Sequence, residues 1–180
     1  ASTVHTEIFS WNTGVTAPGN YRVHILIEQD GRVFDAAEAE FEVNPTLSFS
    51  GTLSIAPVEV TCGDTVQAQC VVANNGNEAA DGGMLQLSVI DLNDPSPAWL
   101  QEKQVTLEVG SSFPDSFVID TAGMMPGIYW ARLHYHMNGD RTQLAEHSFT
   151  VSDGTPPGIS LISPADGNVF HEAFELAVIA

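Results

Sequence analysis

Apolar and polar residues alternate along most of the chain with a period of two, which indicates half-buried β-strands and not amphipathic helices. The alternation is clear in residues 21–28, 65–73 and 84–90. In the first of these stretches the apolar face consists of Tyr21, Val23, Ile25 and Ile27. No apolar run approaches the ~18 residues of a membrane-spanning helix. The pattern therefore predicts an all-β protein without membrane insertion.

One part of this pattern occurs twice. Residues 9–43 align with residues 117–151 without a gap, at an offset of 108 (126 − 18 = 108). Ten aligned positions are identical: Phe9/Phe117, Thr13/Thr121, Pro18/Pro126, Gly19/Gly127, Tyr21/Tyr129, Gly31/Gly139, Ala37/Ala145, Glu38/Glu146, Phe41/Phe149 and Val43/Val151. An ungapped internal match of this kind indicates a repeat architecture.

Each copy has the pattern of a β-hairpin, with turn signals at Gly31 and Gly139 between two alternating strands. If Tyr21 and Phe41 both face the core, parity requires an odd loop. We therefore expect a three-residue loop centred on Gly31, with a positive φ at the glycine. The same register places two pairs of opposite charge across the strands on the outer face, His24 with Glu38 and Arg132 with Glu146.

Residues 46–153 carry strand and turn signals every ~8–12 residues, which is typical of an immunoglobulin-like sandwich. We expect strands at 46–61 (interrupted at Pro57), 65–73, 84–90, 99–109 and 113–119, a polar loop at 91–98, and then the repeated hairpin. These segments predict one complete immunoglobulin-like domain of about seven strands.

Residues 1–45 then read as the C-terminal half of an immunoglobulin-like domain, with a strand at 2–9 before the hairpin. Residues 154–180 read as the N-terminal strands of a further domain, at 159–162 and 174–179, behind a stiff proline-containing linker. The predicted fold class is all-β, with tandem immunoglobulin-like sandwiches.

The chain is strongly acidic, with 5 lysines and arginines against 23 aspartates and glutamates and a net charge of −18. Such a surface argues against nucleic acid and anionic membranes as partners, because both require a basic patch. It fits a protein that is extracellular or on the cell surface, although a need for solubility accounts for it equally well. The expected partners are neighbouring immunoglobulin-like domains of the same or an adjacent chain, which leaves a homopolymer open.

Two cysteines are too few for a disulfide framework. Cys62 lies in a turn and Cys70 in the next strand, which separates them beyond the Cα distance of about 7 Å that a bridge tolerates. We expect Cys70 to be a small buried apolar residue. Cys62 is expected to be free or to form an intermolecular link.

Metal ligands are sparse in the sequence. Weak calcium candidates are Asp91, Asn93, Asp94 and Asp153. Neither acidic segment is a complete loop motif for an ion that needs 6–8 oxygens. His134 and His136 have a spacing that suits one transition metal, but a site needs a third ligand. We therefore expect no cofactor, with calcium as the one option.

No G-x-S-x-G, H-E-x-x-H or phosphate-loop motif occurs, so the sequence gives no reason to expect an enzyme. Trp99 and Trp130 are candidates for interaction, as platforms on which a sugar ring could stack. Trp130 is the better of the two, because parity places it on the outer face of its strand.

The chain resembles tandem immunoglobulin-like domains of bacterial surface proteins. Residues 58–83, VEVTCGDTVQAQCVVANNGNEAADGG, resemble the G-D-T-V … N-x-G opening of CARDB-type adhesion-related domains. Residues 11–25 and 121–133 resemble the closing hairpin of that family, and residues 154–170 resemble the start of a bacterial Ig-like module. The cysteine pair departs from the family pattern.

The resemblance implies a non-catalytic structural or adhesion module, a stalk or spacer in an extracellular repeat protein. Two alternatives stay open. The chain could be a filament subunit in which immunoglobulin-like domains are completed between neighbouring chains. It could also be a carbohydrate-binding accessory module of a secreted enzyme.

Overall fold

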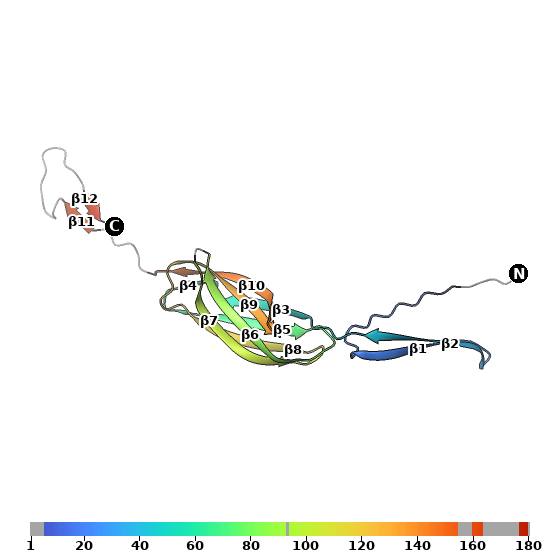
Figure 1. The fold of residues 1–180 in the computed structure, drawn as a ribbon. Helices are drawn as coiled ribbons and strands as arrows, with labels where there is room; N and C mark the ends of the chain where they lie inside the picture. The colour runs from blue at the N-terminus through green and yellow to red at the C-terminus, as the bar shows by residue number, and fades with distance from the viewer. Residues whose placement is uncertain (1–5, 93, 155–159, 164–176, 180) are drawn as a thin grey trace.

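The computed structural model of the chain describes residues 6–92, 94–154, 160–163 and 177–179 (Figure 1). Every regular element within these ranges is a β-strand, which confirms the all-β prediction. The strands are β1 (Gly19–Gln29), β2 (Arg32–Val43), β3 (Phe49–Ala56), β4 (Glu59–Thr61), β5 (Thr65–Asn74), β6 (Ala80–Asp91), β7 (Asp94–Leu107), β8 (Ser112–Asp120), β9 (Gly127–Met137), β10 (Asp140–Ser152), β11 (Ser160–Ser163) and β12 (Ala177–Ile179).

Strands β3 to β10 form a sandwich of two sheets (Figure 1). One sheet has the order β4-β10-β9-β6-β7 and the other has the order β3-β5-β8. Neighbouring strands are antiparallel, except that β4 runs parallel to β10. The core between the sheets is built from alternate residues of each strand, as the period-two pattern predicts; it includes Val66, Ala68, Val72, Leu85, Leu87 and Val89.

The first predicted strand of the sandwich divides at Pro57. β3 pairs with β5 as far as Ala56, and β4 resumes at Glu59 beside β10 in the opposite sheet. Proline has no N–H to donate to a ladder, so the pairing with β5 ends where Pro57 begins. The chain therefore crosses between the sheets over this short connection.

The polar loop expected at 91–98 is wrong, because β7 already begins at Asp94 and pairs with β6 across a tight turn. Pro97 lies opposite Ile90 inside this ladder. β7 is the last strand of its sheet, and a proline on such an edge need not donate to a neighbour. A proline in this stretch is therefore compatible with an edge strand and does not require a loop.

The repeated hairpins β1–β2 and β9–β10 have the same register. Tyr21 pairs with Phe41, and Tyr129 pairs with Phe149. The charged pairs also lie where the sequence predicted them, with His24 Nε2 3.2 Å from Glu38 and Arg132 Nε 3.3 Å from Glu146. In the two copies the stacked tyrosine and phenylalanine rings are 5.7 and 5.9 Å apart.

The predicted three-residue loop is wrong. Each loop has two residues, Asp30-Gly31 and Asn138-Gly139, and all four have a positive φ. Parity is restored by a one-residue bulge in the return strand, at Phe34 in the first copy and at Leu144 in the second. The expected positive φ at both glycines is confirmed. Two-residue hairpin loops that match the twist of the strands require this conformation.

The strand expected at 2–9 is not found in its described part, since residues 6–12 pair with no strand. At the other end of the chain, β11 and β12 pair antiparallel, while much of the expected stretch 174–179 lies outside the described residues. The domain boundaries expected near 45 and 153 fall between β2 and β3 and just after β10. The division into three domains stays a prediction.

Candidate functional site

The chain enters the sandwich at one end and leaves it at the opposite end (Figure 1). The approach to β3, at Leu47 and Phe49, shares a hollow with Asn138 of the β9–β10 turn. The last residue of β10, Ser152, pairs with Thr61 at the far end.

Asn77 holds the segment through which the hairpin β1–β2 joins the sandwich. Its Oδ1 accepts a hydrogen bond from the backbone N–H of Thr46 at 2.7 Å, and its Nδ2 donates to the carbonyl of Asn44 at 3.0 Å. Its own backbone N–H donates to the Thr46 carbonyl at 3.0 Å. A single buried side chain and its backbone thus make three hydrogen bonds to the connecting segment.

The neighbouring residues support this clamp. Asn74 is buried and donates through Nδ2 to the carbonyls of Glu78 and Leu107 at 2.7 and 3.2 Å, which fixes the turn from inside. A Cβ at Gly76 would collide with the carbonyl oxygen of Thr46, so the connection lies directly on the glycine. The sequence Asn74-Asn75-Gly76-Asn77 is a turn signal, and no local feature of it points to the segment that it holds.

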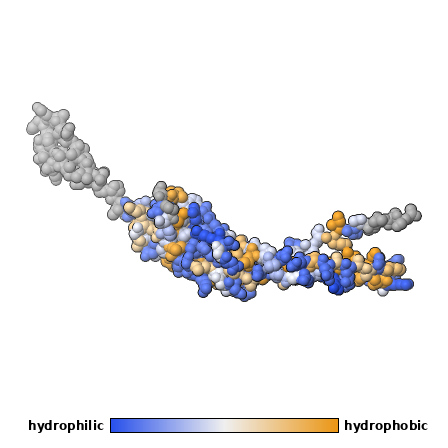
Figure 2. All heavy atoms as spheres, in the orientation of Figure 1, coloured by the Kyte–Doolittle hydropathy of each residue, from blue (hydrophilic) through white to orange (hydrophobic). Residues whose placement is uncertain are grey.

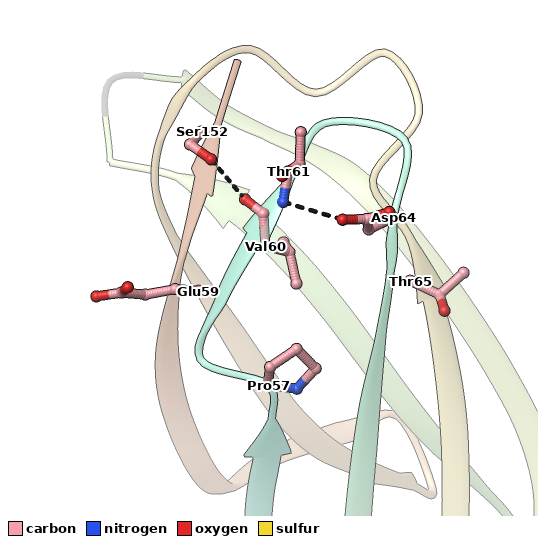
Figure 3. Close-up of a pocket in the computed structure, with 7 residues that line it drawn as sticks. All are labelled: Pro57, Glu59, Val60, Thr61, Asp64, Thr65 and Ser152. Atoms are coloured by element: carbon pink, nitrogen blue, oxygen red, sulfur yellow. Dashed lines mark hydrogen bonds between the residues drawn. The ribbon is translucent and has the colours of Figure 1, made fainter. Parts of the chain in front are cut away.

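The far end of the sandwich has a shallow hollow of about 420 Å³ at the β4–β10 junction (Figure 3). Ser152 Oγ donates to the Val60 carbonyl at 3.1 Å, and the Thr61 N–H donates to Asp64 Oδ2 at 3.3 Å. Glu59 projects away from the hollow (Figure 3). These two hydrogen bonds join groups of the hollow to each other. The hollow is therefore the place where the end of β10 is fixed to β4.

The four calcium candidates do not gather into a described site. Asp91 and Asp94 face each other across the turn at the end of β6, where Asp94 Oδ1 accepts from the Ser96 N–H at 2.8 Å. Asn93 lies outside the described residues. Asp153 follows β10 at the same end of the sandwich. Among the described residues no three His, Cys, Asp or Glu side chains come together as metal ligands.

The outer face of β6, β9 and β10 carries a hollow of about 500 Å³. Arg141 Nη2 lies 3.0 Å from Gln86 Oε1 and 3.2 Å from Nδ1 of the buried His134. Burial lowers the pKa of His134 to about 4, and the charges of Arg141 and His136 add to the lowering. His134 is therefore neutral at pH 7, and its Nδ1 accepts a hydrogen bond from the Arg141 guanidinium.

The two tryptophan candidates lie in different settings. Trp130 is on the outer face, as parity predicts, but it is half-buried and its Nε1 is enclosed without a hydrogen-bond partner. Trp99 is half-buried against the core, with its ring 6.5 Å from that of Phe117 in an edge-on contact. Neither ring is a broad exposed platform.

Lys103 joins the two sheets along the edge where β7 faces β8. Its Nζ lies 2.9 Å from both carboxylate oxygens of Asp115 and donates to the Ser116 carbonyl at 2.8 Å. The same ammonium sits 4.3 Å from the centre of the Phe117 ring, where a cation is attracted to the ring face. The sequence signal for this contact is a lysine in the inward register of a strand, on the same face as the buried Val105 and Leu107.

Both cysteines are free thiols. Cys70 is buried, and burial together with the nearby Asp115 carboxylate raises its pKa to about 11. Cys62 is exposed in its turn, with Sγ 3.4 Å from the Met124 carbonyl. The placement agrees with the expectation that Cys70 acts as an apolar core residue.

No protein-family model matches the chain, and no curated protein matches it significantly. Among solved structures, a β-glucosidase from Listeria innocua in complex with glucose is similar at 14% identity and a TM-score of 0.44, over 67% of this chain and 16% of that one. The CARDB domain of a Pyrococcus furiosus protein in complex with di-metal ions is similar at 12% identity and a TM-score of 0.42, over 60% and 89%.

The alkylpurine DNA glycosylase AlkC of Pseudomonas fluorescens, bound to DNA with an abasic-site analogue, is similar at 13% identity and a TM-score of 0.46, over 60% of this chain and 31% of that one. The chain thus spans about a sixth of the β-glucosidase and about a third of the glycosylase. Identities this low carry no information on activity. No helix long and apolar enough to cross a membrane occurs among the described residues.

Proposed function

We propose that the chain is a non-catalytic structural module, a spacer or stalk segment of an extracellular repeat protein. The observation that carries this proposal is the linear path of the chain, which enters and leaves the sandwich at opposite ends (Figure 1). A module built this way adds its length to a rod, whereas neighbouring termini would produce a side branch.

Two further observations support the proposal. The connection to the hairpin is held by three hydrogen bonds to Asn77, so the joint is built to keep an orientation. The internal repeat means that units of one kind follow each other along the chain, which is how quasi-one-dimensional repeat proteins are organised. The net charge of −18 suits a surface that must stay hydrated and separate.

Small-angle X-ray scattering and sedimentation velocity on the 180-residue chain test this proposal. We expect an elongated monomer whose maximum dimension does not change with protein concentration. A compact particle in which the hairpin folds back on the sandwich would contradict the spacer. Polymers that grow with concentration would favour the filament instead.

A carbohydrate-binding accessory module is the second candidate, and the outer-face hollow is the observation that favours it. The hollow combines Arg132, Arg141 and two glutamine amides with apolar contacts from Leu100 and Pro97, a mixture that suits a sugar with polar and apolar faces. A glycan array probed with the native chain and with Arg141→Ala tests this candidate. A carbohydrate-binding module should show binding that Arg141→Ala weakens, whereas a spacer should show no binding by either protein.

A further inference from the structure

The hairpin β1–β2 exposes an apolar face that its repeat partner buries. Val23, Ile25 and Ile27 are 41%, 49% and 59% exposed. The aligned residues of β9 are fully or almost fully buried against the rest of the sandwich; they are Ala131, Leu133 and Tyr135. Figure 2 shows apolar surface along the hairpin and the coil beside it.

The segment before the hairpin lies beside β1, where the Trp11 ring contacts those of Tyr21 and Phe41, but its described residues 6–12 belong to no β-ladder. Residues 4–12 align with β8, which in the second copy pairs with β5 over its whole length. In the first copy the described part, residues 6–12, pairs with no strand, and Ile8 and Phe9 are 87% and 83% exposed. Phe117, which aligns with Phe9, is buried in the core.

A third unmet requirement is the free edge of β1. In the second copy β9 lies between β10 and β6, with Leu87 opposite Leu133 and Ser88 opposite Arg132. In the described chain β1 pairs with β2 alone. An exposed edge beside an apolar face is a ready template for another strand.

We infer that residues 6–43 bind the opening half of a second sandwich, built like β3 to β7 of this chain, because residues 4–12 themselves align with β8. The occupant must supply a β5-like strand that pairs with residues 6–12 and a β6-like strand that pairs with the free edge of β1. It must also present an apolar face of small and β-branched side chains. β5 shows that face in Val66, Ala68, Cys70 and Val72. The internal repeat specifies this partner, because it shows what covers the same residues in the complete copy.

This inference deepens the proposed function, since it names the partner that the spacer takes at this end. A second copy of the whole chain is a poorer occupant, because its own opening half is already covered by β9 and β10. The occupant is therefore an unfilled half-sandwich, and the ligand class is an apolar antiparallel sheet.

The test is a chimera in which residues 46–116 are repeated ahead of residue 9, at the junction that the repeat defines. We expect the amides of β1 and β2 to exchange with solvent at least about tenfold more slowly than in the unfused chain. Ile25→Asn in the chimera should abolish this protection, whereas the matched change His24→Asn on the opposite face should preserve it. The sandwich 46–153 serves as the internal reference for folding.

A second measurement covers the case in which the added half folds poorly. Cysteines placed at His24 and at the added copy of Ser88 should form a disulfide that peptide mass spectrometry identifies, because the aligned residues lie opposite each other in the β6–β9 ladder. A cysteine at the added copy of Gln86 is the register control and should form none with that at His24.

Three results would overturn the inference. The first is unchanged exchange in β1 and β2 together with an absent or unselective disulfide. The second is equal protection in the Ile25→Asn chimera. The third is a dimer of the unfused chain that already protects the hairpin face, since the occupant would then be a second copy. The scattering test of the spacer uses the unfused monomer, so its outcome is independent of the chimera.

Discussion

Replacing Asn77 with alanine should weaken the joint between hairpin and sandwich. The change removes the hydrogen bonds of its side chain to the Thr46 N–H and the Asn44 carbonyl. Each such bond contributes about 0.5–1.5 kcal/mol, and a buried group left unpaired costs about 1–3 kcal/mol. Because the segment can relax toward water, we expect a loss of about 2–3 kcal/mol in the free energy of unfolding.

Urea denaturation of the whole chain measures this loss. With a denaturant slope of roughly 1–3 kcal/mol/M for a small domain, the midpoint should fall by about 1 M or more. Asn75→Ala is the matched control, because Asn75 is exposed and its side-chain amide donates to Ser50 Oγ at 2.8 Å, away from the connecting segment. Asn77→Asp should be intermediate, since it keeps the acceptor for Thr46 and loses the donor. If Asn77→Ala and Asn75→Ala proved equally mild, the clamp would not hold the connection.

Three further predictions concern the sandwich. Iodoacetamide at pH 8 should label Cys62 in the folded chain and Cys70 only after unfolding, as mass spectrometry would show, because the pKa of Cys70 is raised to about 11; labelling of both at equal rates would contradict the burial. The free energy of unfolding should fall by about 1–3 kcal/mol as the pH drops from 6.5 towards 4, because His134 has a pKa of about 4 when folded and the unfolded chain takes up the proton first. In chemical denaturation at several pH values, His134→Gln should flatten this part of the stability curve, and an unaltered slope would argue against the role of His134. Gly83→Ala should destabilise the sandwich by more than about 2 kcal/mol in thermal unfolding, since the new Cβ would collide with the buried Tyr135 hydroxyl; a wild-type Tm would refute this.

The sequence predicted those parts of the fold that follow from local chemistry. Period-two alternation correctly placed β5 and the inward face of β6, and the glycine turns located both hairpins. The repeat even gave the cross-strand pair of Arg132 and Glu146. These features depend on residues near each other in the chain or directly opposite in a hairpin.

The errors in the predicted fold have physical causes that involve residues far apart in the chain or the order of strands in a sheet. A bulge restores parity as well as a third loop residue does, and alternation alone cannot distinguish them. The prolines near Pro97 suggested a loop because their tolerance depends on β7 being an edge, which only the sheet order reveals. The role of Asn77 was missed for the same reason, since its partners at Asn44 and Thr46 lie more than 30 residues away.

The brevity of the connection between β2 and β3 has a consequence for folding. The chain contains two similar hairpins, and either could in principle cover the sheet β3-β5-β8. For β1–β2 to take the place of β9–β10, Val43 would have to reach the position of Val151, which pairs with Val60 beyond the far end of β3. The length of β3 alone, from Phe49 to Ala56, is ~23 Å at ~3.3 Å per residue.

The six steps from Val43 to Phe49 reach at most ~22 Å when fully stretched. The wrong hairpin is therefore tethered too closely to the start of β3 to occupy the site of the right one within the same chain. A linker of this length acts as a selection device during folding, because it lets two similar hairpins follow each other in one polypeptide without exchanging places.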